Sequence, residues 1–403
     1  GIGLRDEVGS YLYGNISTNV WRTVKMNNIM DYLDWRGDIS FDQDGINEVD
    51  NLIFSMVSYL NFDMLRGANS LEEASKAYAE SKKRGASKET RDFIKKIEKL
   101  LNRLGQVERY RSVRISDYIY KYDHDNESQF CAMTFAFGNW IYVAYRGTDD
   151  SLVGFKEDFN MCFSAPVMAQ KDAVTYLRHI LDKYKDQEVY TGGHSKGGNL
   201  AVYAHVGIEE AYRKRVVQIY NNDGPGFTEE ILKTPEYKET AKKVVKLLPQ
   251  GSVVGILMDD EEEYFIVNAR GDNGIIQHDG LNWDVKGRKF VKKDKFTDQS
   301  TYINRTLKIW LASLDRDERG KFVDEFYDLI VKSTDANMLG DISGKEVQAA
   351  LAMIKNLRSM DEENREILAS AMKKLLKSNS KSIGKISVRK RFKEKAEEIM
   401  KIN

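Results

Sequence analysis

The residues Gly193-His194-Ser195-Lys196-Gly197 constrain this chain more than any other part of its sequence. A short strand pattern at 188–191 precedes them, and a helical pattern with apolar residues at Leu200, Ala201 and Ala204 follows. Small residues on both sides of a serine let a strand turn abruptly into a helix and hold the hydroxyl in a strained, exposed position. We therefore predict a nucleophile at Ser195. The alternative interpretation is an ordinary Gly-rich turn, or an anion site at a helix N-terminus.

Other glycine-rich motifs fit this turn poorly. The spacing from Gly192-Gly193 to Gly197-Gly198 does not match the dinucleotide-binding fingerprint. A phosphate-binding loop is also unsupported, because Lys196 precedes the second pair of glycines instead of following it. We accordingly expect neither a cofactor nor a metal ion.

Strand and helix patterns alternate on both sides of the turn. A helix pattern spans 167–184, and strand patterns occur at 131–137, 140–145, 188–191, 216–220, 243–248, 252–258 and 264–267. The order strand, helix, strand, turn, helix, strand predicts an α/β fold with a mainly parallel sheet, right-handed crossovers and flanking helices.

The flanks of this α/β region have helical patterns and suggest four parts of the chain. We assign 1–64 to the N-terminal part of the catalytic domain and 65–110 to an inserted helical hairpin, which is a candidate cap over the site. The α/β core covers 111–296, and 297–403 is a helical C-terminal region. Its basic tail carries eleven Lys and Arg against three Glu between 373 and 401, which suggests weak contact with a membrane surface or simply a solvated final helix.

The composition limits which partners the protein is expected to bind and which cell compartment it is expected to occupy. The 403 residues include 62 Lys plus Arg and 62 Asp plus Glu, so no overall charge selects a nucleic acid. Only two cysteines occur, Cys131 and Cys162, both among apolar residues, and we expect free thiols in a reducing compartment. No signal peptide and no apolar run of about 18 residues is visible, so a cytoplasmic location is expected.

A serine nucleophile needs a base, and the chain has five histidines. His194 adjoins the nucleophile and is expected to point away from the site, His205 lies too deep in the following helix, and two others precede Ser195, namely His124 and His179. In α/β-hydrolase folds the chain order is serine, acid, histidine, which favours His278. A solvated loop histidine is the alternative.

The acid that would orient this base is less sharply defined. Asp223 follows a strand directly and lies in a Gly/Pro turn, where a carboxylate can be held rigidly beside an imidazole. Asp259, Asp260 and Asp279 are rivals. The first two begin an acidic run that suits a solvated hairpin, and Asp279 adjoins the histidine, so we favour Asp223.

Two donors should stabilise a tetrahedral oxyanion. The backbone N–H of Lys196, immediately after the nucleophile, is one candidate. The loop after the strand ending at Tyr145 would supply the other, and Thr148 is its natural donor. A plain turn at Gly147 is the alternative for this loop.

Several of these motifs together carry a family resemblance. The run Gly193-His194-Ser195-Lys196-Gly197-Gly198-Asn199-Leu200 resembles the signature of an uncharacterised family of bacterial α/β-hydrolase-like proteins related to the class 3 lipases. The similarity extends from about Asn27 to about Trp283, and includes 47–51, 220–227 and 249–255.

This resemblance implies a hydrolase fold and lends support to Thr148, because Tyr145-Arg146-Gly147-Thr148, with Phe155 and Asp158 downstream, looks like the oxyanion-hole motif of those lipases. One position departs from the lipase pattern. The residue comparable to their usual triad acid is Ser252, which cannot serve, so either Asp223 takes that role or the triad is incomplete.

Two functional hypotheses follow. The first is a serine hydrolase that cleaves an acyl ester or thioester of a small molecule or lipid, with Ser195, Asp223 and His278 as its triad and an acyl-enzyme intermediate. The second is a non-catalytic scaffold that uses a hydrolase fold and binds a partner through its helical flanks. The sequence identifies neither the acyl substrate nor the oligomeric state.

Overall fold

The structure is a computed structural model. It describes residues 26–65, 67–83, 92–123, 128–148, 157–158, 160–161 and 166–313, together with residues 318, 320, 321, 324 and 362. Phe155, Cys162, His124, most of the predicted C-terminal helical region and the whole basic tail lie outside these residues.

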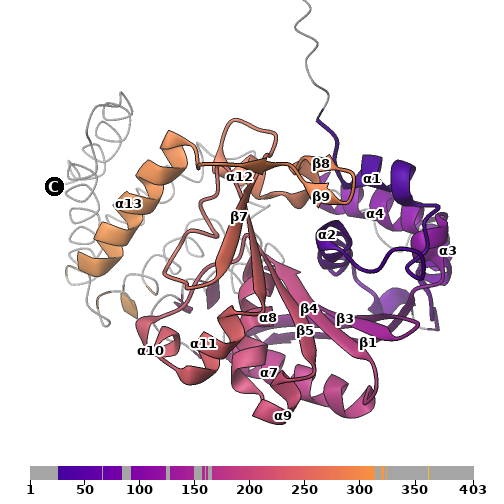
Figure 1. Ribbon diagram of the computed structural model, residues 1–403, viewed down its shortest axis with the longest axis horizontal. Helices are drawn as coiled ribbons and strands as arrows, with labels where there is room; N and C mark the ends of the chain where they lie inside the picture. The colour runs from indigo at the N-terminus through magenta and orange to yellow at the C-terminus, as the bar shows by residue number, and fades with distance from the viewer. Residues whose placement is uncertain are drawn as a thin grey trace, which may run out of the picture.

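An eight-stranded sheet forms the centre of the described part of the chain (Figure 1). Its strands, in spatial order, are β1 (Arg114–Asp123), β2 (Ser128–Phe137), β3 (Trp140–Tyr145), β4 (Glu188–His194), β5 (Val216–Asn222), β6 (Val244–Pro249), β7 (Glu263–Val267) and β10 (Lys292–Lys293). Strands β3 to β7 are parallel, whereas β1, β2 and β10 pair antiparallel at the two edges. A separate pair consists of β8 (Val285–Lys286) and β9 (Lys289–Phe290). The predicted α/β fold with a mainly parallel sheet is confirmed.

Helices cover both faces of this sheet (Figure 1). One layer contains α1 (Ile29–Arg36), α2 (Glu48–Val57), α3 (Leu71–Lys83), α4 (Asp92–Leu104) and α5 (Glu108–Arg111), with the short 3-10 turn η1 (Asp63–Leu65). The other contains α7 (Met168–Lys183), α8 (Lys196–Gly207) and α11 (Pro235–Ala241), with the short α9 (Glu210–Arg213) and α10 (Glu229–Leu232). Later in the chain come α12 (Gly274–His278), η2 (Gly280–Asn282) and α13 (Asp298–Ser313).

The alternation of side chains along β3 explains the two layers. Trp140, Tyr142 and Ala144 belong to the core under α2, whereas the intervening Ile141, Val143 and Tyr145 belong to the core under α7 and α8. Successive side chains of a strand point to opposite faces of a sheet, and a strand covered on both faces is apolar throughout. All six residues of β3 are buried, as this geometry requires.

Helices α3 and α4 occupy the segment predicted as an inserted hairpin. Leu71, Ile97 and Leu101 are buried in the same core cluster as α2 and one face of the sheet. The two helices therefore belong to the layer that covers this face. The division of the chain into domains, and a role of the hairpin as a cap, stay predictions.

The expected strand at 252–258 is wrong. These residues form a series of turns between β6 and β7. The main-chain N–H of Gly255 donates to the Asp223 carboxylate at 3.1 Å, and that of Leu257 bonds back to the Val254 carbonyl at 3.0 Å. Backbone groups used in this way are not available for a strand ladder. The edge strand β1 was not predicted.

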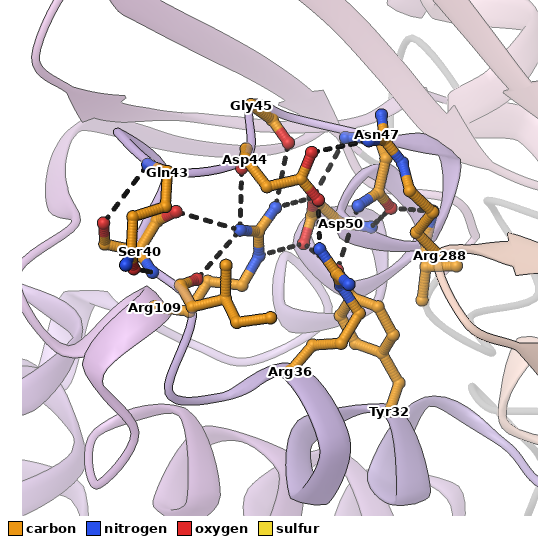
Figure 2. Close-up of polar contacts among 12 residues, drawn as sticks. Tyr32, Arg36, Ser40, Gln43, Asp44, Gly45, Asn47, Asp50, Arg109 and Arg288 are labelled. Carbon is orange, nitrogen blue, oxygen red and sulfur yellow. Dashed lines mark hydrogen bonds and ion pairs between the residues drawn. The ribbon is translucent and has the colours of Figure 1, made fainter.

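A buried ion pair fixes the N-terminal layer (Figure 2). Arg109 and Asp50 are fully buried, with Nη2 of Arg109 2.6 Å from Oδ2 of Asp50. The guanidinium also donates to the main-chain oxygens of Asp44 and Gly45, and Asp50 caps α2 by accepting the N–H of Asn47. These contacts hold the loop before α2 against α5 and so fix the start of α2, whose far end leads to the site.

In the part of the chain that the structure describes, every helix is too short or too polar to cross a membrane. Cys131 is buried and is not part of a disulfide, in agreement with the expectation for this residue.

Candidate active site

Ser195 lies between the last residue of β4 and the first residue of α8. Its backbone has φ 59° and ψ −133°, a conformation that residues other than glycine rarely adopt. A Cβ atom on Gly193 would lie 2.3 Å from the main chain of Gly197, and one on Gly197 would lie 2.1 Å from the carbonyl oxygen of Tyr145. The glycines are therefore needed because strand and helix approach each other this closely, which is the geometry that the sequence predicted.

The turn leaves the serine accessible. Between Thr191 and Val202 every residue is buried except Ser195, which is partly exposed. The N–H of Ser195 donates to the carbonyl oxygen of Asn222 at 2.9 Å, which anchors the turn to the end of β5. Lys196 is the first residue of α8, so its main-chain N–H lies at the positive end of the helix dipole.

His278 and Asp223 are in direct contact. Nδ1 of the His278 ring lies 2.6 Å from Oδ2 of Asp223, although the two residues are 55 positions apart in the sequence. Asp223 is fully buried and His278 is one-fifth exposed. Since Nδ1 is engaged by the carboxylate, Nε2 is the ring nitrogen that can accept a proton from a nucleophile.

The other carboxylate oxygen of Asp223 is held as firmly. Oδ1 accepts the hydroxyl of Ser252 and the main-chain N–H of Gly255. The hydroxyl of Ser300 in turn donates to the carbonyl oxygen of Ser252. Ser252, the position at which the sequence departs from the lipase pattern, thus supports the carboxylate of Asp223.

His194 points toward the site and not away from it, contrary to the sequence interpretation. Its Nε2 lies 2.7 Å from the carbonyl oxygen of His278, and the two rings are 4.6 Å apart. Nδ1 lies 2.9 Å from the hydroxyl of Tyr59, just beyond α2. Burial, with a smaller contribution from His278, lowers the pKa of His194 to about 3, so this ring stays neutral and positions its neighbours.

The loop after β3 lies against the nucleophile. A Cβ atom on Gly147 would lie 2.6 Å from the His194 carbonyl oxygen and 3.1 Å from Cβ of Ser195. Arg146 is buried and donates to the carbonyl oxygens of Ser58 and Leu60, so it joins the loop to the end of the α2 layer. Thr148, the predicted second donor, directly follows Gly147, the residue that lies against Ser195.

The side chains near Thr148 are charged. Its hydroxyl donates to Asp158, whose pKa is raised to about 6 by burial despite the opposing effect of Lys196. Nζ of Lys196 lies 3.0 Å from Glu157. In the described residues no three His, Cys, Asp or Glu side chains form a group that could hold a metal ion.

The rival residues are engaged elsewhere. Each rival carboxylate has a lysine partner: Asp259 pairs with Lys308, Asp260 with Lys246 and Asp279 with Lys96. His205 contacts Thr240 and the carbonyl oxygen of Arg213, and burial lowers its pKa to about 4. His179 is two-thirds exposed on α7.

Sequence reasoning missed Tyr59 and Glu157. Tyr59 is 135 positions from its partner His194, and Glu157 is 39 positions from Lys196. Contacts between residues so far apart in the chain produce no local sequence pattern. Two motifs were signals nearby. Asn51, at the end of the motif 47–51, exchanges side-chain hydrogen bonds with Asn222, one residue before Asp223. Asp158 of the lipase-like motif directly follows Glu157.

A family model described as Mbeg1-like matches residues 104–328, which is more than half of the chain and includes every predicted residue of this site. The chain belongs to the Mbeg1-like family. No curated protein sequence gives a significant match to this Mbeg1-like chain.

Three solved structures with a detectable likeness are a triacylglycerol lipase, a protein described as MDLA and a further lipase. The triacylglycerol lipase, from Penicillium expansum, is 13% identical, with 44% of this chain and 76% of the lipase covered and a TM-score of 0.29. A mutant form of MDLA from Penicillium cyclopium is 11% identical, with 62% and 86% covered and a TM-score of 0.35. A protein described as M37 lipase is 13% identical, with 51% and 68% covered and a TM-score of 0.30.

Proposed function

We propose that this Mbeg1-like protein is a serine hydrolase that cleaves a carboxylic ester or thioester. The observation that carries the proposal is the 2.6 Å contact of His278 with the buried Asp223, on the same sheet edge as the strained, partly exposed Ser195. In α/β sheets the carboxyl ends of the strands bear the site, and here β4 and β5 lead directly into Ser195 and Asp223.

The proposed reaction begins with attack of the Ser195 hydroxyl on an acyl carbonyl carbon. Nε2 of His278 accepts the serine proton, and Asp223 stabilises the resulting imidazolium through Nδ1. The main-chain N–H of Lys196 and the main-chain N–H of Thr148 donate to the oxyanion of the tetrahedral intermediate, because the Thr148 hydroxyl already donates to Asp158. The intermediate then collapses, and His278 protonates the departing alcohol or thiol.

Water completes the cycle. His278 takes a proton from water, the hydroxide attacks the acyl-enzyme, and the free acid leaves as Ser195 recovers its proton. The chemistry accommodates a small-molecule or lipid acyl group, and a cytoplasmic location belongs to the same proposal.

A fluorophosphonate probe tests the proposal, because it phosphonylates only an activated serine. The wild-type chain is expected to be labelled and to hydrolyse a soluble p-nitrophenyl ester, whereas Ser195→Ala is expected to do neither. Ser112→Ala is a control that keeps both activities, since this serine is exposed at the end of α5. Equal labelling of wild type and Ser195→Ala would overturn the proposal and favour a non-catalytic scaffold.

A further inference from the structure

The side chain of Lys196 is buried, although the residue follows a partly exposed serine. Only 1% of the side chain is accessible. Its Nζ lies 3.0 Å from the carbonyl oxygen of Gln129, 3.1 Å from Oε1 of the same residue and 3.0 Å from Oε2 of Glu157. An ammonium group has three N–H donors, so each has an acceptor.

Glu157 connects this lysine to two other elements. Its side chain is 2% exposed, and Oε2 also accepts the N–H of Gln129 at the start of β2. Oε1 accepts the N–H of Ala169 in the first turn of α7 at 3.0 Å. Glu157 thus joins β2, α7 and the start of α8 at one buried point.

The next residue holds the other side of the site. Asp158 accepts the hydroxyl of Thr148, and its Oδ1 lies 3.7 Å from Nζ of Lys196. Two consecutive carboxylates therefore bind the side chains of the two residues that the proposed mechanism assigns as oxyanion donors. The two donor residues are far apart in the sequence, and the adjacent carboxylates of Glu157 and Asp158 join their side chains.

Stability alone does not explain such a pair. A buried ion pair loses the hydration of both ions, and an apolar pair of similar volume is often at least as stable. A long apolar side chain at position 196 would satisfy the core between β2 and α7. The ion pair of Lys196 and Glu157 adds a defined geometry, because each of its charged hydrogen bonds fixes the positions of the two bonded atoms.

We infer that Glu157 and the side chain of Lys196 position the oxyanion hole, because they set the distance between the main-chain N–H groups of Lys196 and Thr148. The inference rests on the proposed serine hydrolase function. Oxyanion donors act in the transition state, so a misplaced donor lowers kcat and leaves KM nearly unchanged.

Lys196→Met tests this role, because it removes the cation and keeps both the chain length and the backbone N–H. We expect kcat for a soluble p-nitrophenyl ester to fall about 10- to 100-fold, somewhat less than the loss of a whole donor, with KM within about twofold. Rates are expressed per Ser195 titrated to completion with a fluorophosphonate, so that unfolded protein does not contribute.

Lys246→Met is the matched control. Lys246 is also fully buried and pairs with Asp260 at 2.6 Å, but it lies on β6, two strands from the β4 end that leads into the turn. Both variants lose a buried ammonium, and both are expected to melt at a lower temperature. Only Lys196→Met should lose kcat per titrated site, because a purely structural role would affect the two variants alike.

Glu157→Gln keeps the proposal testable if Lys196→Met does not fold. Its amide oxygen can still accept from Gln129 and Lys196, while its NH₂ group replaces Oε1 and loses the bond from the Ala169 N–H. The shape of the side chain is kept and its charge is lost. We expect a kcat loss of about 5- to 30-fold, and a loss in the double variant no larger than that of Lys196→Met alone, since residues acting as a unit are not additive.

The outcomes separate two failures. If the wild type is neither labelled nor active, the proposed function fails and the positioning role fails with it. If the wild type is active and both variants keep full kcat per titrated site, the positioning role alone is overturned.

Discussion

Nε2 of His194 lies 2.7 Å from the main-chain carbonyl oxygen of His278, while Nδ1 of the same ring lies 2.9 Å from the hydroxyl of Tyr59. A carbonyl oxygen only accepts, so Nε2 carries the hydrogen and the Tyr59 hydroxyl donates to Nδ1. The residue beside the nucleophile therefore holds the main chain of the base. This arrangement has a consequence for stability at acid pH.

His194 should make the protein less stable below neutral pH. In the unfolded chain it titrates near pH 6.5, whereas burial lowers its pKa to about 3 in the folded protein. The unfolded state thus binds the extra proton between pH 6.5 and 3, and stability is lost as pH falls through this range. The loss due to this residue at pH 5 is on the order of 2 kcal/mol.

Replacement of the ring tests this assignment. In His194→Gln the decrease in free energy of unfolding between pH 8 and pH 5, measured with urea, should be smaller than in wild type by about that amount. His179→Gln, at an exposed position on α7, should keep the wild-type pH dependence. An unchanged pH dependence in His194→Gln would contradict the prediction.

Asp223→Asn should abolish most of the proposed activity without unfolding the chain. The amide can still accept from Ser252 and Gly255, but its NH₂ group would face Nδ1 of His278 and favour the tautomer with hydrogen on Nε2, which cannot act as a base. We expect kcat to fall by about 10⁴, as for the same change in serine proteases.

The control for this variant is the rival acid. Asp279→Asn removes the charge of the ion pair with Lys96 but can still accept the N–H of Leu281. Its kcat should stay within about threefold of wild type, since that pair is near the protein surface. A larger loss in Asp279→Asn than in Asp223→Asn would reverse the assignment of the acid.

The features that could be predicted from the sequence are those that depend on residues close together in the chain. The strand at 140–145 and the tight turn with glycines at 193 and 197 both depend on neighbours within a few residues, and both expectations agree with the structure. The pairing of Asp223 with His278 could be predicted because α/β-hydrolase folds restrict the chain order of the candidates.

The unpredicted part depends on contacts between distant residues. The strand expected at 252–258 is absent because the Gly255 N–H bonds to Asp223, a contact across 32 positions. Lys196 and Glu157 are residue types that are usually exposed, and nothing local marks them as a buried pair. Such contacts cannot be predicted from composition or from the periodicity of apolar residues.

Ser195 should store backbone strain that glycine relieves. At φ 59° and ψ −133° a Cβ atom costs on the order of 1–3 kcal/mol, and both Ser195→Gly and Ser195→Ala remove the hydroxyl. After allowance for the greater chain entropy of unfolded glycine, we expect Ser195→Gly to be more stable than Ser195→Ala by about 1 kcal/mol. Urea unfolding measures the difference.

A helical serine gives the opposite order. At Ser55, within α2, the glycine variant should be less stable than the alanine variant by about 1 kcal/mol. If glycine were also the less stable replacement at Ser195, the turn would not be strained.

Glu262 should make the protein more stable in acid, which is opposite to the effect of His194. This carboxyl is 5% exposed, accepts the side-chain N–H of Asn221 at 3.2 Å and lies 3.5 Å from the hydroxyl of Tyr237. Burial raises its pKa from 4.5 to about 7, although Lys246 opposes the shift. The folded state therefore binds more protons between pH 4.5 and 7, and stability falls as pH rises through this range.

Glu262→Gln resembles the protonated acid at every pH. At pH 8 its free energy of unfolding should exceed that of wild type by up to about 3 kcal/mol, whereas at pH 4.5 the two should nearly agree. Glu261→Gln, at the exposed neighbouring position, should match wild type at both pH values. An equal effect of Glu262→Gln at both pH values would mean that the carboxyl stays charged in the folded protein. A stabilisation confined to high pH would instead show that the acid is neutral in the folded protein below its raised pKa of about 7, where it accepts from Asn221, two residues before Asp223.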